Sequence, residues 1–112
     1  MKVHSYYSKS GKDLIREYIN GLPKTEKVDG LTVLNDLENG HIEKLFIKRW
    51  RGKIFEVYFK KHNRIFFVSI DNSEIYLLHS CRKQKNKTEK KDENIVIKRA
   101  KELGRYLNKK FL

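Results

Sequence analysis

Apolar residues recur every three or four positions in two stretches within the first forty residues. The first stripe comprises Leu14, Ile15, Tyr18, Ile19 and Leu22, and the second comprises Val28, Leu31, Leu34 and Leu37. This spacing places the apolar side chains on one face of a helix. Ser10 and Asp13 have the spacing of a capping box, and the Asn-Gly pairs at 20–21 and 39–40 mark the two helix ends. The pattern therefore predicts an antiparallel helical hairpin.

From residue 54 the period changes to the two-residue alternation of strands. Three strands are predicted, over 54–59, 64–70 and 74–79. The polar turns between them are so short that the strands must form an antiparallel meander. A shorter first strand is expected within residues 2–7, where Val and Tyr are favourable for a strand.

The remaining segments complete a one-domain fold. Residues 82–94 are almost wholly polar and predict an exposed loop, and a final amphipathic helix is expected over 94–108. We therefore predict a single α+β domain over residues 1–112. Its N-terminal helical hairpin packs on a twisted antiparallel β-sheet, and a C-terminal helix follows the sheet.

The charge of the chain points to a polyanionic partner. Twenty-six Lys and Arg against fourteen Asp and Glu give a formal net charge of +12 on 112 residues. An excess of this size is typical of proteins that bind phosphate-rich polymers. An acidic protein partner or a merely solvated surface accounts for the same charge. The hydrophobic content of 38% is enough for a core, which excludes a wholly disordered tail.

Several other classes are disfavoured. No apolar run approaches the roughly 20 residues of a membrane span, and the first seven residues contain no apolar signal core. We therefore expect a cytoplasmic protein that does not bind membranes. The single Cys81 and the four scattered histidines lack the spacing of metal ligands, so we expect neither a metal nor a cofactor.

Two basic groups flank the predicted meander. One comprises Lys44, Lys48, Arg49, Arg51, Lys53, Lys60, Lys61 and Arg64, and the other comprises Arg82, Lys83, Lys85, Lys87, Lys90 and Lys91. Because neighbouring antiparallel strands end and begin at the same edge, we expect Arg64 and residues 79–87 to face one cleft. A cationic cleft suits phosphate chemistry without a metal, because cations stabilise the extra charge of a pentavalent phosphorus transition state.

Each candidate side chain also has a purely structural interpretation. Arg64 either binds phosphate or forms an ion pair with Glu56 or Glu74. His79 either transfers protons or is a hydrogen-bonded residue at the end of a strand. Tyr58 either stacks on a base or is a half-buried strand residue.

The segment Glu74–Thr88, EIYLLHSCRKQKNKT, resembles the signature of HigB-like toxins, in which Leu-Leu-His precedes a lysine-rich stretch. These toxins belong to the RelE/ParE superfamily of type II toxin–antitoxin systems, which includes phage-derived members. Shorter matches occur in the same order at 18–23 (YINGLP), 34–40 (LNDLENG), 54–57 (IFEV), 63–67 (NRIFF) and 97–100 (IKRA). The resemblance spans residues 3–107, nearly the whole chain.

The resemblance implies a RelE-like fold and an endoribonuclease that cleaves mRNA without a metal, in many relatives only on the ribosome. The ribose 2′-OH attacks the adjacent phosphate and leaves a 2′,3′-cyclic phosphate and a 5′-OH. The family's arginine and first loop lysine fall on Arg64 and Lys83, and we add His79 and Tyr58 as catalytic candidates. With the basic groups described above, the expected RNA-binding residues are Arg82, Lys85, Lys87, Lys60, Lys61, Arg51 and Lys53.

The resemblance also implies partners. These are mRNA, the 70S ribosome and a cognate helix-turn-helix antitoxin with which the toxin forms an oligomer. The chain departs from the family pattern at Tyr58, where an arginine is usual, and at Cys81, Gln84 and Glu89. These departures keep two alternatives open. One is a non-catalytic toxin that inhibits a protein such as DNA gyrase, as ParE-type relatives do, and the other is a degenerate phage protein that only binds nucleic acid.

Overall fold

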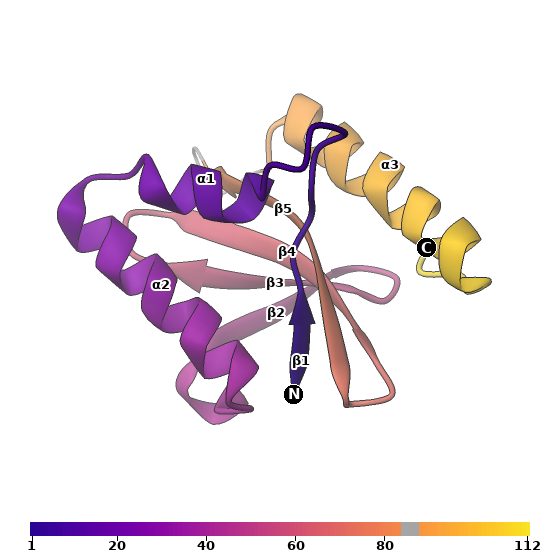
Figure 1. Ribbon diagram of the computed structural model, residues 1–112, viewed down its shortest axis with the longest axis horizontal. Helices are drawn as coiled ribbons and strands as arrows, with labels where there is room; N and C mark the ends of the chain where they lie inside the picture. The colour runs from indigo at the N-terminus through magenta and orange to yellow at the C-terminus, as the bar shows by residue number, and fades with distance from the viewer. Residues whose placement is uncertain (84–87) are drawn as a thin grey trace.

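The computed structural model describes residues 1–83 and 88–112. Within these residues the strands form one five-stranded sheet with the order β1-β5-β4-β3-β2. Three helices accompany it in the described ranges (Figure 1). In chain order the elements are β1 (Lys2–His4), α1 (Leu14–Asn20), α2 (Lys24–Glu38), the short 3-10 turn η1 (Ile42–Lys44), β2 (Phe46–Arg51), β3 (Ile54–Phe59), β4 (Asn63–Ile70), β5 (Glu74–Arg82) and α3 (Lys90–Leu107). The predicted α+β class is confirmed.

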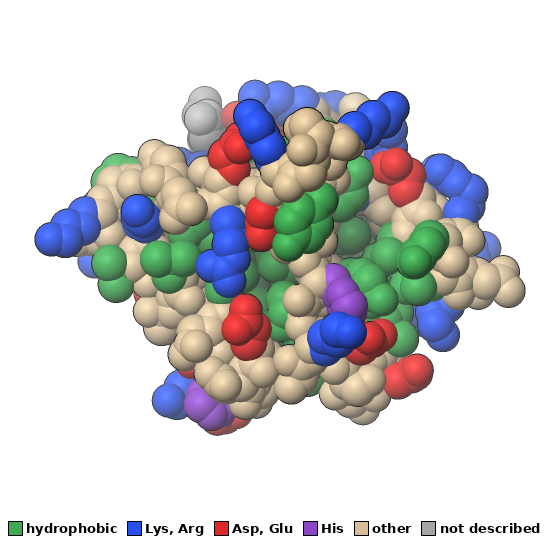
Figure 2. All heavy atoms as spheres, viewed as in Figure 1, with side chains coloured by type: hydrophobic (Ala, Val, Ile, Leu, Met, Phe, Trp, Pro, Cys, Tyr) green, Lys and Arg blue, Asp and Glu red, His purple; other side chains and the backbone are tan. Residues whose placement is uncertain are grey.

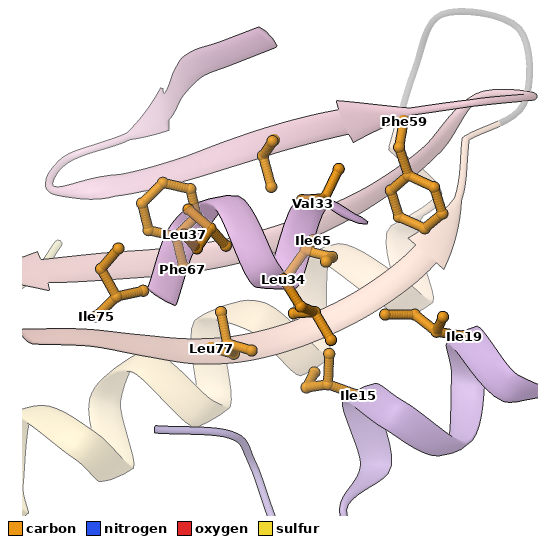
Figure 3. Close-up of a cluster of buried hydrophobic side chains, with 11 residues drawn as sticks. Ile15, Ile19, Val33, Leu34, Leu37, Phe59, Ile65, Phe67, Ile75 and Leu77 are labelled. Atoms are coloured by element: carbon orange, nitrogen blue, oxygen red, sulfur yellow. The ribbon is translucent and has the colours of Figure 1, made fainter. Parts of the chain in front are cut away.

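Helices cover both faces of the sheet because successive strand residues point to opposite sides. Val57, Ile65 and Leu77 belong to the core that the sheet shares with α1 and α2 (Figure 3). Their neighbours Ile54, Phe66 and Leu78 belong to a second core that includes Val96 and Ala100 of α3. β4 therefore lies in the middle of the sheet with nearly all of its side chains buried.

The helical hairpin begins and ends close to the predicted positions. Asp13 is the cap of α1, and its Oδ1 accepts hydrogen bonds from the backbone N–H groups of Ile15 and Arg16. Ser10, the other half of the expected capping box, instead contacts the hydroxyl of Ser8. Gly30 of α2 is buried where a Cβ atom would lie 3.0 Å from Ile19 of α1. The missing side chain lets the hairpin pack closely.

The sheet differs from the prediction at both of its edges. β1 pairs with β5 in the parallel direction, with Val3 opposite Ile75, so the sheet is mixed and only the β2–β5 part is antiparallel. β2 was not predicted as a strand. It carries three cations, and a bulge between Arg49 and Arg51 interrupts the two-residue alternation that would have marked it. Charged residues of this kind are common on edge strands.

The predicted exposed loop over 82–94 is largely wrong. Arg82 is the last residue of β5, and residues 90–94 form the first turn of α3. Thr88 and Asp92 are buried, because this segment turns back onto the sheet. The segment was predicted as a loop because its first helical turn contains mostly charged residues. Residues 84–87 lie outside the described part of the chain.

The C-terminal tail packs back between α3 and the β2–β3 turn. Phe111 is 5% exposed and belongs to the second core. Its carbonyl oxygen accepts a 2.8 Å hydrogen bond from the backbone N–H of Lys53. The close approach requires two glycines, because a Cβ at Gly52 would lie 2.4 Å from that oxygen and a Cβ at Gly104 would lie 2.6 Å from the Lys109 carbonyl oxygen. Among the described residues, none of the helices combines the length and apolar character of a membrane span.

Candidate active site

A pocket of about 430 Å³ lies at the end of the sheet where β3 turns into β4. Its lining comes from four neighbouring segments: Lys48 of β2, Tyr58 and Phe59 of β3, His62 and Arg64 around the start of β4, and Lys83 after β5. The strand register explains this convergence. Tyr58 is opposite Arg64, and Asn63 is opposite Arg82, so the residue after Arg82 emerges beside the β3–β4 turn.

Arg64 lines this pocket although its residue is only 2% exposed. Its Nη1 donates a 2.9 Å hydrogen bond to Oε2 of Glu56, which is equally buried. The structural interpretation of Arg64, an ion pair with Glu56, is therefore present, and the side chain still lines the pocket. Among the described residues, no group accepts a hydrogen bond from its buried Nε. A buried donor without an acceptor costs about 1–3 kcal/mol.

Tyr58 connects the ion pair to the pocket. Its hydroxyl donates a hydrogen bond to Oε1 of Glu56, so both carboxylate oxygens of Glu56 have donors. The guanidinium carbon of Arg64 lies 4.6 Å from the centre of the Tyr58 ring, and Lys83 Nζ lies 5.7 Å from it. Burial and the Glu56 hydrogen bond raise the pKa of Tyr58 above its ordinary value. Tyr58 is thus a neutral platform for two cations.

Lys83 is the partly exposed cation of the pocket. Its backbone N–H donates a 2.8 Å hydrogen bond to the carbonyl oxygen of His62, which fixes the end of β5 against the β3–β4 turn. Burial, followed by the positive charge of Arg64, lowers the pKa of Lys83, while Glu56 opposes the shift and Lys48 adds to it. A lysine with a lowered pKa releases its proton more easily than one on the open surface.

His79 lies on β5 away from the residues that line the pocket. Its Nε2–H donates to Oδ1 of Asp92 at 2.8 Å, and its Nδ1 faces Arg99 Nη1 at 3.5 Å. Because a guanidinium has no acceptor, Nδ1 must be the accepting nitrogen of a neutral ring. Burial lowers the pKa of His79 despite the opposing effect of Asp92. The structural interpretation of His79 therefore fits its surroundings, and its catalytic role stays a prediction.

The same histidine belongs to a group of three potential metal ligands. Ligand atoms of His79, Cys81 and Asp92 lie within 4.8 Å of one another. Both ring nitrogens of His79 already face a partner, as described above. Burial raises the pKa of Cys81 to about 12, which disfavours the thiolate that a metal requires. The contacts of these three residues are thus those of a hydrogen-bonded group rather than a preformed metal site.

The other residues expected to bind RNA are spread over several places. Arg82 forms an ion pair with the buried Glu26 of α2, which also binds Asn63. Arg51 ends β2 and Lys53 lies in the turn before β3, at the opposite end of β3 from the pocket. Lys60 and Lys61 lie in the turn beside it, and Lys85 and Lys87 fall outside the described residues.

Some cations of the predicted cleft form ion pairs with acidic residues of the chain itself, as Arg82 does with Glu26. Arg51 forms an ion pair with Glu93 at 2.5 Å, so this cation already has an acidic neighbour. Figure 2 shows Lys and Arg side chains scattered over the face in view rather than gathered in one patch. The structure therefore brings together Tyr58, Arg64 and Lys83 from the predicted set, whereas Arg51, Lys53 and His79 lie elsewhere.

The predicted site residues did not include Lys48 and His62 of the pocket or Glu56 behind it. Lys48 belonged to the first basic group, but β2 was not expected and its position was therefore unknown. Glu56 shares a strand face with Tyr58 by simple alternation, and this signal was sufficient to place it beside Arg64. His62 lies in a polar turn, where sequence alone does not show which way a side chain projects.

These observations define an α+β domain whose mixed sheet carries a cationic pocket at one end. Residues 17–101 match the model of the family described as phage-derived protein Gp49-like (DUF891). The chain belongs to this family, which is associated with RelE/ParE-like toxins. No curated protein matches the chain significantly. The family supports the broader resemblance to toxin proteins, and the narrower assignment to HigB-like toxins stays a prediction.

Proposed function

We propose that the protein is the toxin of a type II toxin–antitoxin system and that it cleaves mRNA on the translating ribosome. The observation that carries the proposal is the pocket in which Lys48, Arg64 and Lys83 converge from three segments. Glu56, the carboxylate bound to Tyr58 and Arg64, is 3% exposed and is not among the residues that line the pocket. The exposed part of the pocket is therefore cationic, as a phosphate group requires.

The contacts of each cation suggest its role. Lys48 is exposed and Lys83 is partly exposed where they line the pocket, so both are suited to bind the phosphates on either side of the scissile bond. Arg64 is held by Glu56 and cannot move toward solvent without breaking a buried ion pair. It is therefore preorganised, as a fixed positive charge beside the pocket, to stabilise the charge that develops on phosphorus. Arg64 and Lys83 both lie over the Tyr58 ring, which positions the two cations relative to each other.

The proposal also names partners. A toxin must be neutralised in the cell that makes it, and the net charge of +12 favours fast association with an acidic antitoxin. We propose that this antitoxin is the helix-turn-helix protein that the resemblance implies, and that the two form an oligomer. Co-expression with the product of the adjacent gene, followed by purification of the complex, tests this partner.

Controlled induction of the chain in cells, with sequencing of RNA 5′ ends, tests the activity. We expect new 5′-OH ends within reading frames, in phase with codons, and growth arrest. The matched variant Lys83→Ala removes one exposed cation while leaving the Arg64–Glu56 pair intact, and it should lower the number of cuts at equal protein level. Purified protein should cut mRNA far faster with 70S ribosomes than without them. Growth arrest with intact mRNA would refute the proposal and favour a toxin that inhibits a protein target.

A further inference from the structure

His62 is the pocket residue whose chemistry the proposed function does not yet use. It lies in the β3–β4 turn, is exposed to solvent and lines the pocket with Arg64 and Lys83. The backbone around it is fixed. Its φ angle is 65°, its carbonyl oxygen binds the Lys83 N–H at 2.8 Å, and the next residue, Asn63, is completely buried. A histidine held in this way projects from a rigid turn beside the two proposed phosphate-binding cations.

Cleavage by a 2′-OH requires a group that takes the hydroxyl proton, and the other pocket residues are poorly suited to this task. The Tyr58 hydroxyl already donates a hydrogen bond to Glu56, and the pKa of Tyr58 is raised above its ordinary value. Glu56 has a donor on each oxygen and is buried behind the pocket. Arg64 carries a guanidinium, which is not deprotonated in proteins, and Lys48 is assigned above to phosphate binding. Phe59 has no titratable group, and the remaining residues are Lys83 and His62.

We propose that His62 is the general base of the cleavage reaction and Lys83 the general acid, an inference that rests on the proposed function. An imidazole nitrogen of His62 takes the proton of the ribose 2′-OH as the O2′–P bond forms. The P–O5′ bond breaks, and the departing O5′ takes a proton from the Lys83 ammonium group. The products are a 2′,3′-cyclic phosphate and a 5′-OH, and both side chains regain their original protonation states by exchange with water.

The charges around the pocket favour this division of roles. Lys48 of β2, Arg64 of β4 and Lys83 face it from three sides, and Glu56 lies behind Tyr58 of β3. Burial and the positive charge of Arg64 lower the pKa of Lys83 and so favour release of its proton to the departing O5′. His62 supplies the proton acceptor that the cations of the pocket lack.

The experiment measures cleavage of mRNA on 70S ribosomes against pH for the full chain, two His62 variants and one control variant. His62→Asn removes the imidazole with a residue that tolerates a left-handed turn, as Asn72 does at φ 58° in the next turn. His62→Gly leaves space for free imidazole in solution. His41→Asn is the matched control, because His41 lies after α2 and is 46% exposed beside Asp36. All variants should keep the wild-type circular dichroism spectrum.

We expect His62→Asn to cleave at least about 100-fold more slowly at saturating ribosomes, with KM little changed. The fall of the rate on the acid side of the pH profile should disappear in this variant. Added imidazole should restore His62→Gly by about tenfold or more and should leave His62→Asn unchanged. If the wild type cleaves and His62→Asn matches it in rate and pH profile, the role of His62 is refuted. If the wild type itself does not cleave, the proposed function fails and this inference fails with it.

Discussion

Substitution of Gly104 by alanine tests the packing of the C-terminal tail. Gly104 is buried inside α3, three residues before the helix ends. On helix propensity alone, Gly104→Ala stabilises the protein by about 1 kcal/mol. The structure predicts the opposite sign. A Cβ at this position would lie 2.6 Å from the carbonyl oxygen of Lys109, far inside the normal contact distance, and the obstacle is backbone that cannot rotate away.

The expected change in the free energy of unfolding follows from the hydrogen bond and the apolar burial that the tail loses when it is displaced. Lys109 donates a 2.8 Å hydrogen bond to the Gly104 carbonyl oxygen, worth about 0.5–1.5 kcal/mol. Phe111 is 5% exposed, and its burial contributes about 1.5–3 kcal/mol. Displacement of the whole tail therefore costs about 2–4 kcal/mol, against which the propensity gain of about 1 kcal/mol must be set. We expect a net loss of about 1–3 kcal/mol in the free energy of unfolding.

Urea denaturation of the wild type, Gly104→Ala, Phe111→Ala and the double variant provides the measurement. If both substitutions act by releasing the tail, the double variant should be less destabilised than the sum of the single variants. Gly21→Ala is the control, because a Cβ there would lie 3.5 Å from the nearest atom at an ordinary φ, and its effect should stay within about 0.5 kcal/mol. An increase of about 1 kcal/mol in the stability of Gly104→Ala would refute the reasoning.

Three further predictions concern the buried polar groups. Arg64→Met should lower the free energy of unfolding by about 3–5 kcal/mol because it leaves the Glu56 charge buried without its partner, and the double variant with Glu56→Gln should recover part of that loss in urea denaturation. The folded-state pKa of His79 lies below its unfolded value, so stability contributed by the neutral ring is present above the unfolded pKa and declines as the pH falls below it. Urea midpoints between about pH 8 and pH 5 should therefore fall more steeply for the wild type than for His79→Gln, and equal slopes would contradict this. Cys81 should resist alkylation by iodoacetamide in the native protein and react fully after unfolding, because burial raises its thiol pKa to about 12; rapid native labelling, measured by mass spectrometry, would disagree.

The sequence predicted the parts of the fold whose periodicity is regular. The stripes of the first two helices and the alternation of the three meander strands gave their order and direction correctly. β2 was missed because its bulge and its three cations conceal the alternation. The first turn of α3 shows no helical pattern in the sequence because Lys90, Lys91 and Glu93 give it no apolar face, although Asp92 is buried against His79.

The candidate site was predictable only where strand pairing determines position. A short turn after Phe59 places Tyr58 opposite Arg64, and alternation then places Glu56 on the same face. Ion pairs between distant segments cannot be derived in this way. Arg82 pairs with Glu26, and Arg51 pairs with Glu93, so two cations expected to meet RNA already have acidic neighbours. The charge count of the sequence does not reveal such pairings.

The parallel pairing of β1 with β5 has a consequence for the order in which the protein folds. The β3–β4–β5 meander joins strands through turns of a few residues, so its contacts form early and locally. Pairing of Val3 with Ile75 instead closes a loop of about 70 residues, at an entropic cost of about 4 kcal/mol. The N-terminal strand can add to the sheet only after β5 has been synthesised. Because Lys83 follows β5, a growing chain completes its cationic pocket only after β5 has been synthesised.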